Sequence, residues 1–478
     1  MPFAATALEL RARLAPYMYM APIQSLSPIP EQDDLFIPPS APPLTGEEGF
    51  IRATYTFLKN PLEGFGPLAW NQPIVSIPAF GNVTHVVSDP AGIGTVLVTK
   101  AANFTKAPID HRILSPATKE GLLSVHGDQW KRQRKTVAPI FRPRFIEQLA
   151  PMVREVVDGF IDSIDDAQEV ELNTAMADLT FDVLAKALLG DPKGLDGERL
   201  KFATRNVVTS AGTLRPDDLL PLPRWVPRPM APKGALALRK LKAAADDLIA
   251  ARDPDNPGDD LVGLLIGAGD KDGNLSPREQ RDNLIGFFIA GHETTALTLT
   301  WALYLLGRHR PTAERVRAEV ESLAGGAPIT YAMTRELPFT QAVIDETMRL
   351  YPPAPLMNRE CHVETEVCGR TIEPGHVVVI NNYIMHRAER LWDNPNAFDP
   401  DRFLRDPTLK AKGAPFKPFG AGPRICVGAA FAIMESVMAL ASLVRAFDIR
   451  IGDNVYPKPV MTVTLRPEGG VPARLIRR

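Results

Sequence analysis

The sequence predicts a mainly helical protein with a smaller β-rich region, and three observations support this. Apolar residues recur at helical spacing through much of the chain between 144 and 350, and the longest such stretch covers 277–308. Alternating apolar and polar stretches, typical of short strands, occur at Ile74–Phe80 and Thr84–Asp89. Strand-like sequence returns over 363–382, after the helical part.

The helical pattern divides into segments where glycine, proline or polar clusters interrupt it. The first segment runs over 144–166, and Pro151 interrupts it or marks its start. The C-terminal residues 461–475 are expected to form a hairpin. Further helices are expected over 177–190, 200–211, 233–252, 258–268, 277–308, 311–324, 337–350 and 427–446.

The 478-residue chain has the composition of an ordinary globular protein, with 45% hydrophobic and 23% charged residues. Lys and Arg number 54 against 56 for Asp and Glu, so the formal charge is −2, which argues against general nucleic-acid binding. Three cysteines cannot build a disulfide framework, which favours a reducing compartment. Residues 1–14 lack a signal-peptide pattern, and we therefore expect a cytoplasmic protein.

No integral membrane anchor is expected either. The one candidate span, Leu284–Gly307, contains His292 and Glu293 near its middle, where a bilayer would penalise both side chains. We therefore interpret this stretch as a long buried helix.

Two proline-rich segments are expected to lie outside the regular elements. Residues 1–48 form a lead-in that either packs along the surface or is partly mobile. A second segment, 213–234, holds six prolines between Pro216 and Pro232. This segment is either a rigid connector, or a lid over a pocket or a patch that touches a membrane surface.

The segment Phe419–Gly428, FGAGPRICVG, is the most specific motif in the chain. Its glycines and proline predict a tight turn that places Cys426 at the start of the helix over 427–446. There, the helix dipole and free N–H groups are expected to lower the pKa of the thiol. A lone thiolate beside an arginine suits haem iron better than zinc, because Cys361 and Cys368 offer no close-set pair of ligands. The alternative is an inert, buried cysteine.

This segment resembles the haem loop of the cytochrome P450 family, the haem-thiolate monooxygenases. All five fixed positions of that loop are matched, by Phe419, Gly422, Arg424, Cys426 and Gly428. The resemblance implies that Cys426 is the axial ligand of the iron of haem b. It also implies that Arg424 contacts a haem propionate and that Phe419 belongs to the cofactor-binding loop.

A second motif, DETMRLYPPAP, contains Glu346 and Arg349, which share one helix face and can form an ion pair. Such a pair is often a weak surface interaction. The segment resembles the family's Glu-x-x-Arg helix, and Arg402 in FDPDRF resembles its third partner. The resemblance implies a buried structural network of Glu346, Arg349 and Arg402 that supports the haem loop.

A third motif, AGHETT, spans Ala290–Thr295. The small residues Ala290 and Gly291 allow a ligand to approach the helix, and an acid beside a hydroxyl is costly to bury without a purpose. Alternatively, Thr294 bonds the carbonyl one turn back and Glu293 reaches the surface. The motif is similar to the family's oxygen-binding helix, which implies that Glu293 and Thr294 deliver protons during O2 cleavage, with Ala290 and Gly291 beside the haem.

A fourth motif, GDQWKRQRK, places Trp130 and Arg134 one helical turn apart, where both can reach one anion. A solvated basic helix, with or without nucleic-acid contact, is the alternative. The motif resembles the family's Trp-x-x-x-Arg helix, whose side chains contact the haem propionates. Arg359 in PLMNRE matches another frequent propionate partner.

The four motifs follow the family's order, and the resemblance extends from about residue 50 to the C-terminus. It implies one cytochrome P450 haem domain over 49–478, of mainly helical fold, with the haem between the long central helix and the cysteine loop and its helix. The expected cytoplasmic location resembles the soluble, bacterial-type members of the family.

The implied reaction inserts one oxygen atom of O2 into a hydrophobic small molecule and reduces the other to water. Its two electrons originate from NAD(P)H and arrive through separate partners, expected to be a ferredoxin or flavodoxin with its reductase. We expect a monomer that docks the partner on a basic face near the cysteine, formed by Lys131, Arg132, Lys135, Lys410, Lys412 and Lys417.

Two other functions compete with this interpretation. A peroxygenase of the same fold would use hydrogen peroxide, but such members usually lack the acid–threonine pair. A non-catalytic haem sensor or carrier would have no need of that pair. By resemblance, the substrate pocket is lined by Phe287, Leu356, Met357 and Met461, which favours a fatty-acid-, terpenoid- or aromatic-like substrate.

Overall fold

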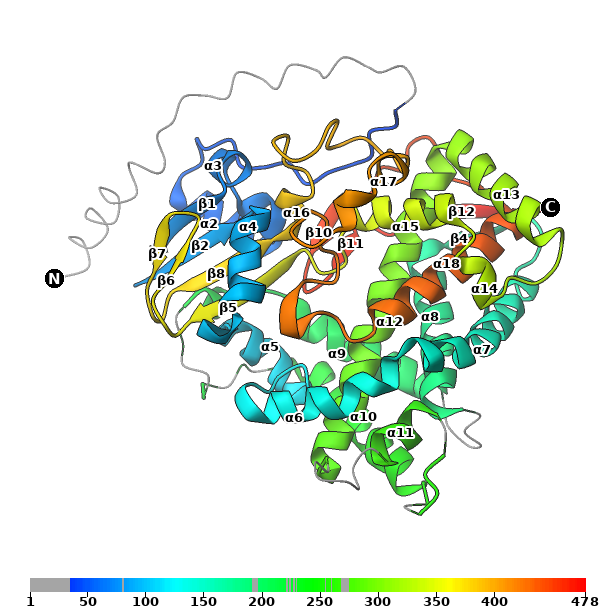
Figure 1. The fold of residues 1–478 in the computed structure, drawn as a ribbon, viewed down its shortest axis with the longest axis horizontal. Helices are drawn as coiled ribbons and strands as arrows, with labels where there is room; N and C mark the ends of the chain where they lie inside the picture. Colours follow the sequence, from blue (N-terminus) through cyan, green and yellow to red (C-terminus); the bar gives the residue numbers. More distant parts are fainter. Residues whose placement is uncertain are drawn as a thin grey trace.

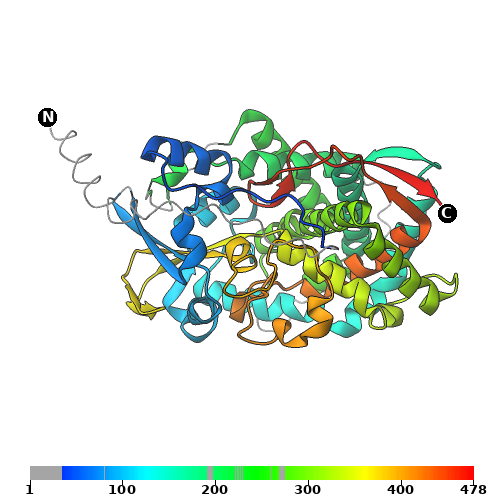
Figure 2. The same ribbon diagram turned by 90° about the horizontal axis from the view of Figure 1, so that it is seen from above.

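The computed structural model describes most of residues 35–478. Helices fill one side of the molecule, and the largest sheet with the β6–β7 hairpin lies at the other (Figures 1 and 2). The mainly helical fold with a small β-rich region is therefore confirmed. Outside the described residues lie 1–34, 80, 191–196, 221, 223, 224, 227, 229, 254, 259 and 268–274.

The longer helices match the predicted segments to within a few residues, with two exceptions. The helix predicted over 177–190 begins earlier, at Leu172, and no helix was predicted over 108–118, where the structure has one. The longer helices are α5 (Pro108–Thr118), α6 (Gly127–Val137), α7 (Pro143–Asp162), α8 (Leu172–Leu189), α9 (Gly197–Gly212), α10 (Pro232–Ala250), α11 (Leu261–Gly267), α12 (Pro277–Arg308), α13 (Arg310–Ala324), α15 (Pro338–Leu350) and α18 (Ala429–Ala446).

Shorter helical segments connect these helices and the strands. They are α2 (Phe50–Lys59), η1 (Pro61–Gly64), α3 (Pro67–Asn71), α4 (Pro90–Gly94), η2 (Thr95–Thr99), η3 (Ala101–Asn103), η4 (Ala138–Phe141), η5 (Pro216–Leu219), α14 (Tyr331–Thr334), α16 (Asn382–Met385), α17 (Arg402–Arg405), η6 (Pro407–Lys410) and η7 (Gly422–Arg424).

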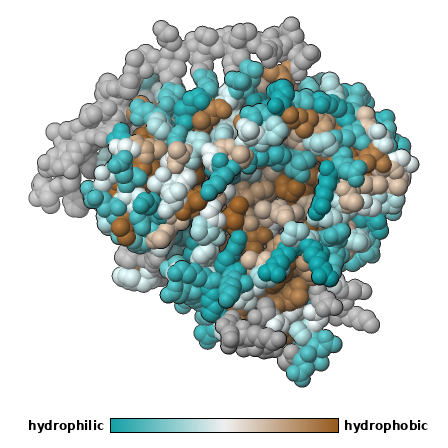
Figure 3. All heavy atoms as spheres, in the orientation of Figure 1, coloured by the Kyte–Doolittle hydropathy of each residue, from teal (hydrophilic) through white to brown (hydrophobic). Residues whose placement is uncertain are grey.

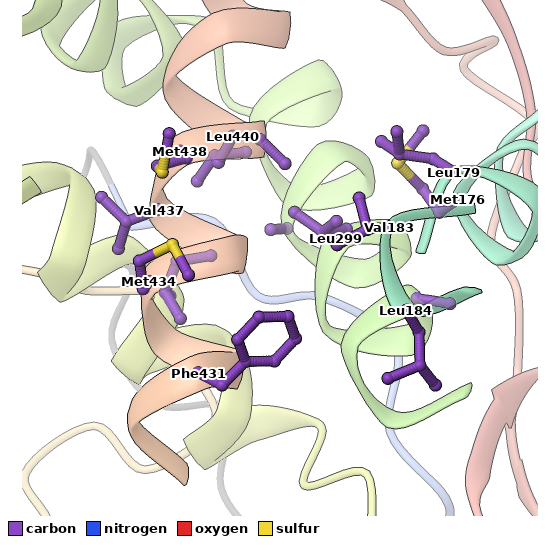
Figure 4. Packing of buried hydrophobic residues seen from close by; sticks show 14 of the residues in the cluster. Met176, Leu179, Val183, Leu184, Leu299, Phe431, Met434, Val437, Met438 and Leu440 are labelled. Atoms are coloured by element: carbon purple, nitrogen blue, oxygen red, sulfur yellow. The ribbon is translucent and has the colours of Figure 1, made fainter. Parts of the chain in front are cut away.

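Helix α12 is the central element of the core. It begins with a capping box, in which Ser276 and Glu279 bond each other's backbone N–H groups, and Pro277 occupies the first turn. Figure 4 shows apolar side chains of α8 and α18 directed toward α12, among them Val183 and Phe431. The stretch Leu284–Gly307 is therefore a buried helix, as predicted.

One described helix, α18, is long and apolar enough to cross a membrane by length and composition. Two thirds of it is buried against the rest of the protein, as in the core helix of a globular domain. Apolar residues also gather near the centre of the face in Figure 3, where hydrophilic side chains surround them.

The largest sheet has five strands in the order β1-β2-β8-β5-β3. Strand β2 pairs with β8 in parallel, and the other pairs are antiparallel. The strand-like stretch over 363–382 contains the β6–β7 hairpin and β8. The strands are β1 (Ile74–Ala79), β2 (Asn82–Val87), β3 (Phe104–Lys106), β5 (Leu356–Cys361), β6 (Thr365–Val367), β7 (Arg370–Ile372) and β8 (Val377–Asn381).

The single C-terminal hairpin expected over 461–475 is wrong. Strand β10 (Pro459–Met461) pairs with β11 (Leu465–Pro467), but β12 (Pro472–Arg477) joins a separate sheet with β4 (Gln168–Glu171) and β9 (Phe447–Arg450). Gly469 and Gly470, both at positive φ, turn the chain away from β11. In the new sheet, β12 buries its alternate apolar side chains.

The described part of the proline-rich lead-in, residues 35–48, packs along the body of the protein. Phe36 forms a β-bridge with Phe398, and the Tyr383 hydroxyl accepts a hydrogen bond from the backbone N–H of Ala41 at 2.8 Å. The expected boundary between residues 48 and 49 stays a prediction, since residues 1–34 lie outside the described part.

Candidate active site

A cavity of about 1030 Å³ lies between α12 and the cysteine loop. The structure brings most of the predicted site residues to its wall, and only Glu293 and the Glu346–Arg349–Arg402 group lie elsewhere. The residues at the wall are Cys426, Arg424, Phe419, Trp130, Arg134, Arg359, Ala290, Gly291, Thr294, Phe287, Leu356, Met357 and Met461.

The cysteine loop owes its shape to glycine. Gly422 has a φ of +72°, and a Cβ atom there would lie 1.8 Å from the carbonyl oxygen of Leu97. The backbone N–H of Cys426 donates to the Phe419 carbonyl at 3.0 Å, which closes the turn. Cys426 thus lies at the cavity wall, just before Gly428, the N-cap of α18.

The prediction of a lowered thiol pKa at Cys426 is wrong for the protein without a metal. Burial raises this pKa, and the N–H of Gly428 and the charge of Arg134 oppose the rise only in part. Ordinary helix-terminus electrostatics therefore does not ionise the thiol. Coordination to a metal ion ionises such a thiol directly.

Four cations surround one end of the cavity, and they test whether haem fits. Lys106 and Arg359 lie directly opposite each other across β3 and β5, a destabilising arrangement for like charges. Arg424 stacks over the Trp130 ring at 4.4 Å, and burial together with Arg359 and Arg134 lowers its pKa to about 10. The positive charge of these four side chains therefore exceeds the negative charge of the carboxyl groups near them.

The buried carboxyl group of Asp110 lies among these cations. Burial lowers the pKa of Lys106 to about 8, Asp110 opposes this, and Arg424 and Arg359 add to it. The two propionates of haem would supply the missing negative charge at this end of the cavity. The residues therefore fit haem, with Cys426 to ligate the iron. Sequence analysis missed Lys106, because strand pairing alone places it beside Arg359.

The α12 side of the cavity carries the predicted oxygen-binding motif. The Thr294 hydroxyl donates to the Ala290 carbonyl at 2.9 Å and lies at the cavity wall. Any side chain at Gly291 would meet Leu184 at 2.9 Å, so the small residue allows close packing with α8. Both the predicted cavity position of Thr294 and its alternative bond one turn back are therefore observed.

Glu293 does not face the cavity beside Thr294, contrary to the expected arrangement of an acid–threonine pair. Its carboxylate accepts a hydrogen bond from the Thr464 hydroxyl at 2.6 Å and pairs with the guanidinium of Arg466. Successive residues on a helix point in different directions, about 100° apart, so only Thr294 reaches the cavity. Its predicted role in proton delivery stays a prediction.

The Glu346–Arg349–Arg402 network is fully buried, so the alternative of a surface pair is wrong. Arg349 forms two bonds of 2.7 Å to Glu346, and Arg402 adds a third at 3.0 Å. These guanidinium groups hold the pKa of Glu346 below its usual range despite burial. Arg349 also donates to the His386 carbonyl at 2.7 Å, and the His386 ring bonds the backbone N–H of Lys417, next to the cysteine loop.

The 213–234 segment contributes to the cavity as well. Leu214, Leu219 and Leu222 line it, which favours the lid interpretation over a simple connector. Its η5 turn is held on α5 by the buried Arg112, which bonds the partly exposed Asp217 at 2.9 Å and lies 3.7 Å from the buried Asp218. Trp225 in the same segment is 82% exposed.

Comparison with known proteins agrees with this site. The family model described as Cytochrome P450 matches residues 70–471, and the chain therefore belongs to the cytochrome P450 family. It is 29% identical over 430 residues to Cyclooctatin synthase of Streptomyces melanosporofaciens, covering 86% of this chain and 94% of that protein.

Two plant relatives are similarly distant. A Cytokinin hydroxylase of Arabidopsis thaliana is 32% identical over 378 residues, covering 73% of this chain and 71% of its own. LUTEIN DEFICIENT 5, chloroplastic, of Arabidopsis thaliana is 28% identical over 430 residues, covering 82% of this chain and 70% of its own.

The chain is thus a haem-thiolate monooxygenase that hydroxylates small molecules with O2 and electrons from NAD(P)H, passed through redox partners. When bound, haem supplies the oxygen-activating chemistry that side chains lack. Cys426 would hold its iron. The cluster of Trp130, Arg134, Arg359, Arg424 and Lys106 would hold its propionates.

Proposed function

We propose that this monooxygenase hydroxylates an extended apolar molecule of the fatty-acid, terpenoid or aromatic kind. The cavity carries this proposal, because its wall away from the cation cluster is mainly apolar and spans several elements. Phe287 on α12 packs edge-on against Phe141, and Leu356, Met357 and Met461 complete the predicted lining. A pocket of this kind orients a substrate by shape more than by hydrogen bonds.

The test is a panel of fatty acids, terpenoids and aromatic compounds, titrated against the haem-loaded protein. Binding of a ligand next to the haem would change the Soret spectrum, and we expect long apolar members to give the tightest titrations. Phe287→Ala should weaken them, while Leu236→Ala, an exposed residue of α10, should not. A preference for small polar compounds would contradict the proposal.

We infer that Thr294 provides the proton-donating hydroxyl at the reacting site. Its bond to the Ala290 carbonyl keeps the hydroxyl at the cavity wall, and Glu293 stands behind it, engaged with Thr464 and Arg466. Thr294→Val should divert electrons from product to hydrogen peroxide. Equal product and peroxide yields in Thr294→Val and the wild type would contradict this role.

For the redox partner we propose an acidic ferredoxin or flavodoxin, docking near Cys426. The structure changes the predicted basic face, because Lys410 is paired with Asp345, Lys131 with Asp128 and Arg132 with Glu279, while Lys417 is buried. Lys135, Lys412, Arg142 and Arg144 are exposed, and Phe141, next to Arg142, lies beside Gly428 of the cysteine loop. These four cations support the proposal.

Charge reversal tests this docking surface. Lys135→Glu and Arg144→Glu should slow reduction of the iron by an acidic ferredoxin at low salt, and the difference should shrink at high salt. Arg370→Glu, an exposed cation on the β6–β7 hairpin, is the control. Equal slowing by all three variants would reject a specific site. We propose that the enzyme is a cytoplasmic monomer. Sedimentation of the purified protein checks the monomeric state.

A further inference from the structure

The segment between α5 and α6, residues 119–126, forms part of the cavity wall, and we call it the α5–α6 loop. The side chains of Leu122 and Leu123 line the cavity. Leu123 lies against Gly286 of α12, where an added Cβ atom would be 3.5 Å from the Leu123 Cδ1 atom. Gly286 comes one turn before Ala290, so the loop closes the cavity next to the oxygen-binding motif.

Two buried side chains of α12 hold this loop by its backbone. The Asp282 carboxylate accepts from the backbone N–H of Glu120 at 2.9 Å. The Asn283 side-chain oxygen accepts from the backbone N–H of Leu122 at 2.9 Å. Gly121, between these two N–H groups, approaches α12 so closely that an added Cβ atom would lie 2.7 Å from the Asp282 carbonyl oxygen. The loop backbone is therefore fastened directly to α12.

The amide of Asn283 has one orientation that satisfies its neighbours. Its Nδ2 atom donates to the Gln133 side-chain oxygen at 3.0 Å and to the Glu279 carbonyl at 2.8 Å. Both hydrogens of the amide are thus used, and its oxygen is directed at the loop. The fully buried Gln133 in turn donates to the Glu120 carbonyl at 2.6 Å. A satisfied buried network of this kind specifies one position of the loop.

The same loop bonds two of the cations that fit the haem propionates. Lys106 donates from Nζ to the Leu123 carbonyl. Arg424 donates from Nη2 to the Val125 carbonyl at 3.0 Å. One short segment therefore supplies side chains to the apolar wall and carbonyl groups to the cation cluster. A shift of its backbone would change both.

We propose that Asn283 is a positioning residue that fixes the α5–α6 loop, and that this loop couples the shape of the substrate pocket to the retention of haem. Held on α12, the loop keeps Leu123 in the wall and orients Lys106 and Arg424 by its carbonyl groups. Released from α12, it would widen the pocket and leave both cations less well oriented. The part concerning ligands rests on the apolar substrate proposed above.

Three variants separate the fastening from the wall. Asn283→Ala removes the acceptor that the loop backbone uses. Gly121→Ala displaces the loop by steric contact and keeps every hydrogen-bonding group. Leu123→Ala widens the pocket but leaves the backbone bonds in place. The controls are Asn206→Ala, which removes a side-chain bond within α9, and Gly159→Ala on α7, where an added Cβ atom meets nothing within 4 Å.

Hydrogen exchange of the haem-loaded protein tests the fastening. Exchange of 119–125 should be about fivefold faster in Asn283→Ala and in Gly121→Ala, the size expected for one buried hydrogen bond. It should be unchanged in Leu123→Ala and in both controls. Unchanged exchange in Asn283→Ala and Gly121→Ala would overturn the proposal, and so would faster exchange across the whole chain. If Asn283→Ala does not fold, Gly121→Ala decides.

Two further measurements test the coupling. Haem should pass to an acceptor protein faster from Asn283→Ala and Gly121→Ala than from the wild type, but not from Leu123→Ala. In Soret titrations, all three variants should bind branched apolar ligands more tightly, relative to unbranched ones, than the wild type does. A change in only one of the two properties in Asn283→Ala and Gly121→Ala would overturn the coupling. If no apolar compound titrates the wild type, the proposed function fails, whereas exchange and haem transfer still decide the role of Asn283.

Discussion

At the residue scale, the two buried groups of charged side chains differ in how well positive and negative charges balance. The buried Glu346 faces two arginines and is fully bonded, whereas the cations around Arg424 outnumber the carboxyl group that lies among them, that of Asp110. The motifs predicted the buried network and the arginines of the cation cluster, but not Lys106. They did not predict the direction of Glu293, because a one-residue step along α12 separates the cavity from the β11 side of the helix.

Loss of the buried carboxylate at Glu346 should severely destabilise the protein. Glu346→Gln leaves Arg349 and Arg402 as uncompensated buried cations, for which we expect a cost of about 3–5 kcal/mol. Asp401→Asn, which breaks the exposed Arg315 pair, should cost less than about 1 kcal/mol. Urea unfolding of both variants checks the contrast, and equal losses would contradict the buried network's importance.

The lowered pKa of Lys106 predicts an unusual pH dependence of the apoprotein. A lysine whose pKa falls from 10.5 to about 8 on folding binds its proton more weakly in the folded state, so its charge destabilises the fold below that pKa. Stability should therefore rise as the pH increases from about 8 toward 10.5. Thermal unfolding across this range should show the rise in the wild type, and Lys106→Met should lack it.

In the haem-loaded protein, Lys106→Met should have the opposite effect and weaken the complex. The propionates would add negative charge beside Lys106, so Lys106→Met should weaken haem retention while stabilising the apoprotein at neutral pH. Transfer of haem to an acceptor protein measures the retention. A variant that loses both haem and apoprotein stability would show that Lys106 serves packing instead.

At the scale of elements, Leu214, Leu219 and Leu222 form one side of the cavity, which we call its roof. The position of this roof depends on ion pairs between α5 and η5. Asp218 is buried and accepts from Arg228 at 2.8 Å, and Arg112 lies at 3.7 Å from it. No helix or strand periodicity signals such a contact, because it joins α5 to a proline-rich segment 105 residues further along the chain. The sequence consequently left open whether 213–234 is a connector or a lid, and the ion pairs indicate a lid fastened to α5.

Breaking this fastening should open the roof. Asp218→Asn removes the charge shared by Arg112 and Arg228, so we expect faster hydrogen exchange in η5 and faster entry of apolar ligands into the cavity. Asp178→Asn, which weakens the partly exposed pairs between α8 and α9, is the control. Unchanged ligand entry in Asp218→Asn would show that the roof is not the access route.

For the whole molecule, the helices were predictable because long amphipathic or buried patterns dominate their sequences. The motifs located the site, since their residues lie within short segments that fold locally. The sheet that β12 joins and the approach of Lys106 to Arg359 were not predictable, because both depend on pairing between segments distant in the chain. The position of Cys426 at the cavity was predicted correctly. The direction of its pKa shift was not, because burial outweighs the effect of the helix terminus.

Removal of haem should therefore loosen the molecule unevenly. The cavity of about 1030 Å³ borders α6, α12 and the cysteine loop, so these lose packing and the cations there lose their counter-charge. The β4–β12–β9 sheet does not line the cavity and pairs through its own backbone bonds.

Hydrogen exchange of the haem-free and haem-loaded proteins measures this difference. Protection should fall most in α6, in 286–298 and in 419–428, and least in β9 and β12. Binding of haem to the folded state alone should also raise the unfolding temperature. Uniform loss of protection across the chain would mean that haem holds the whole fold together, because the helical core and the terminal sheet would then unfold as one unit.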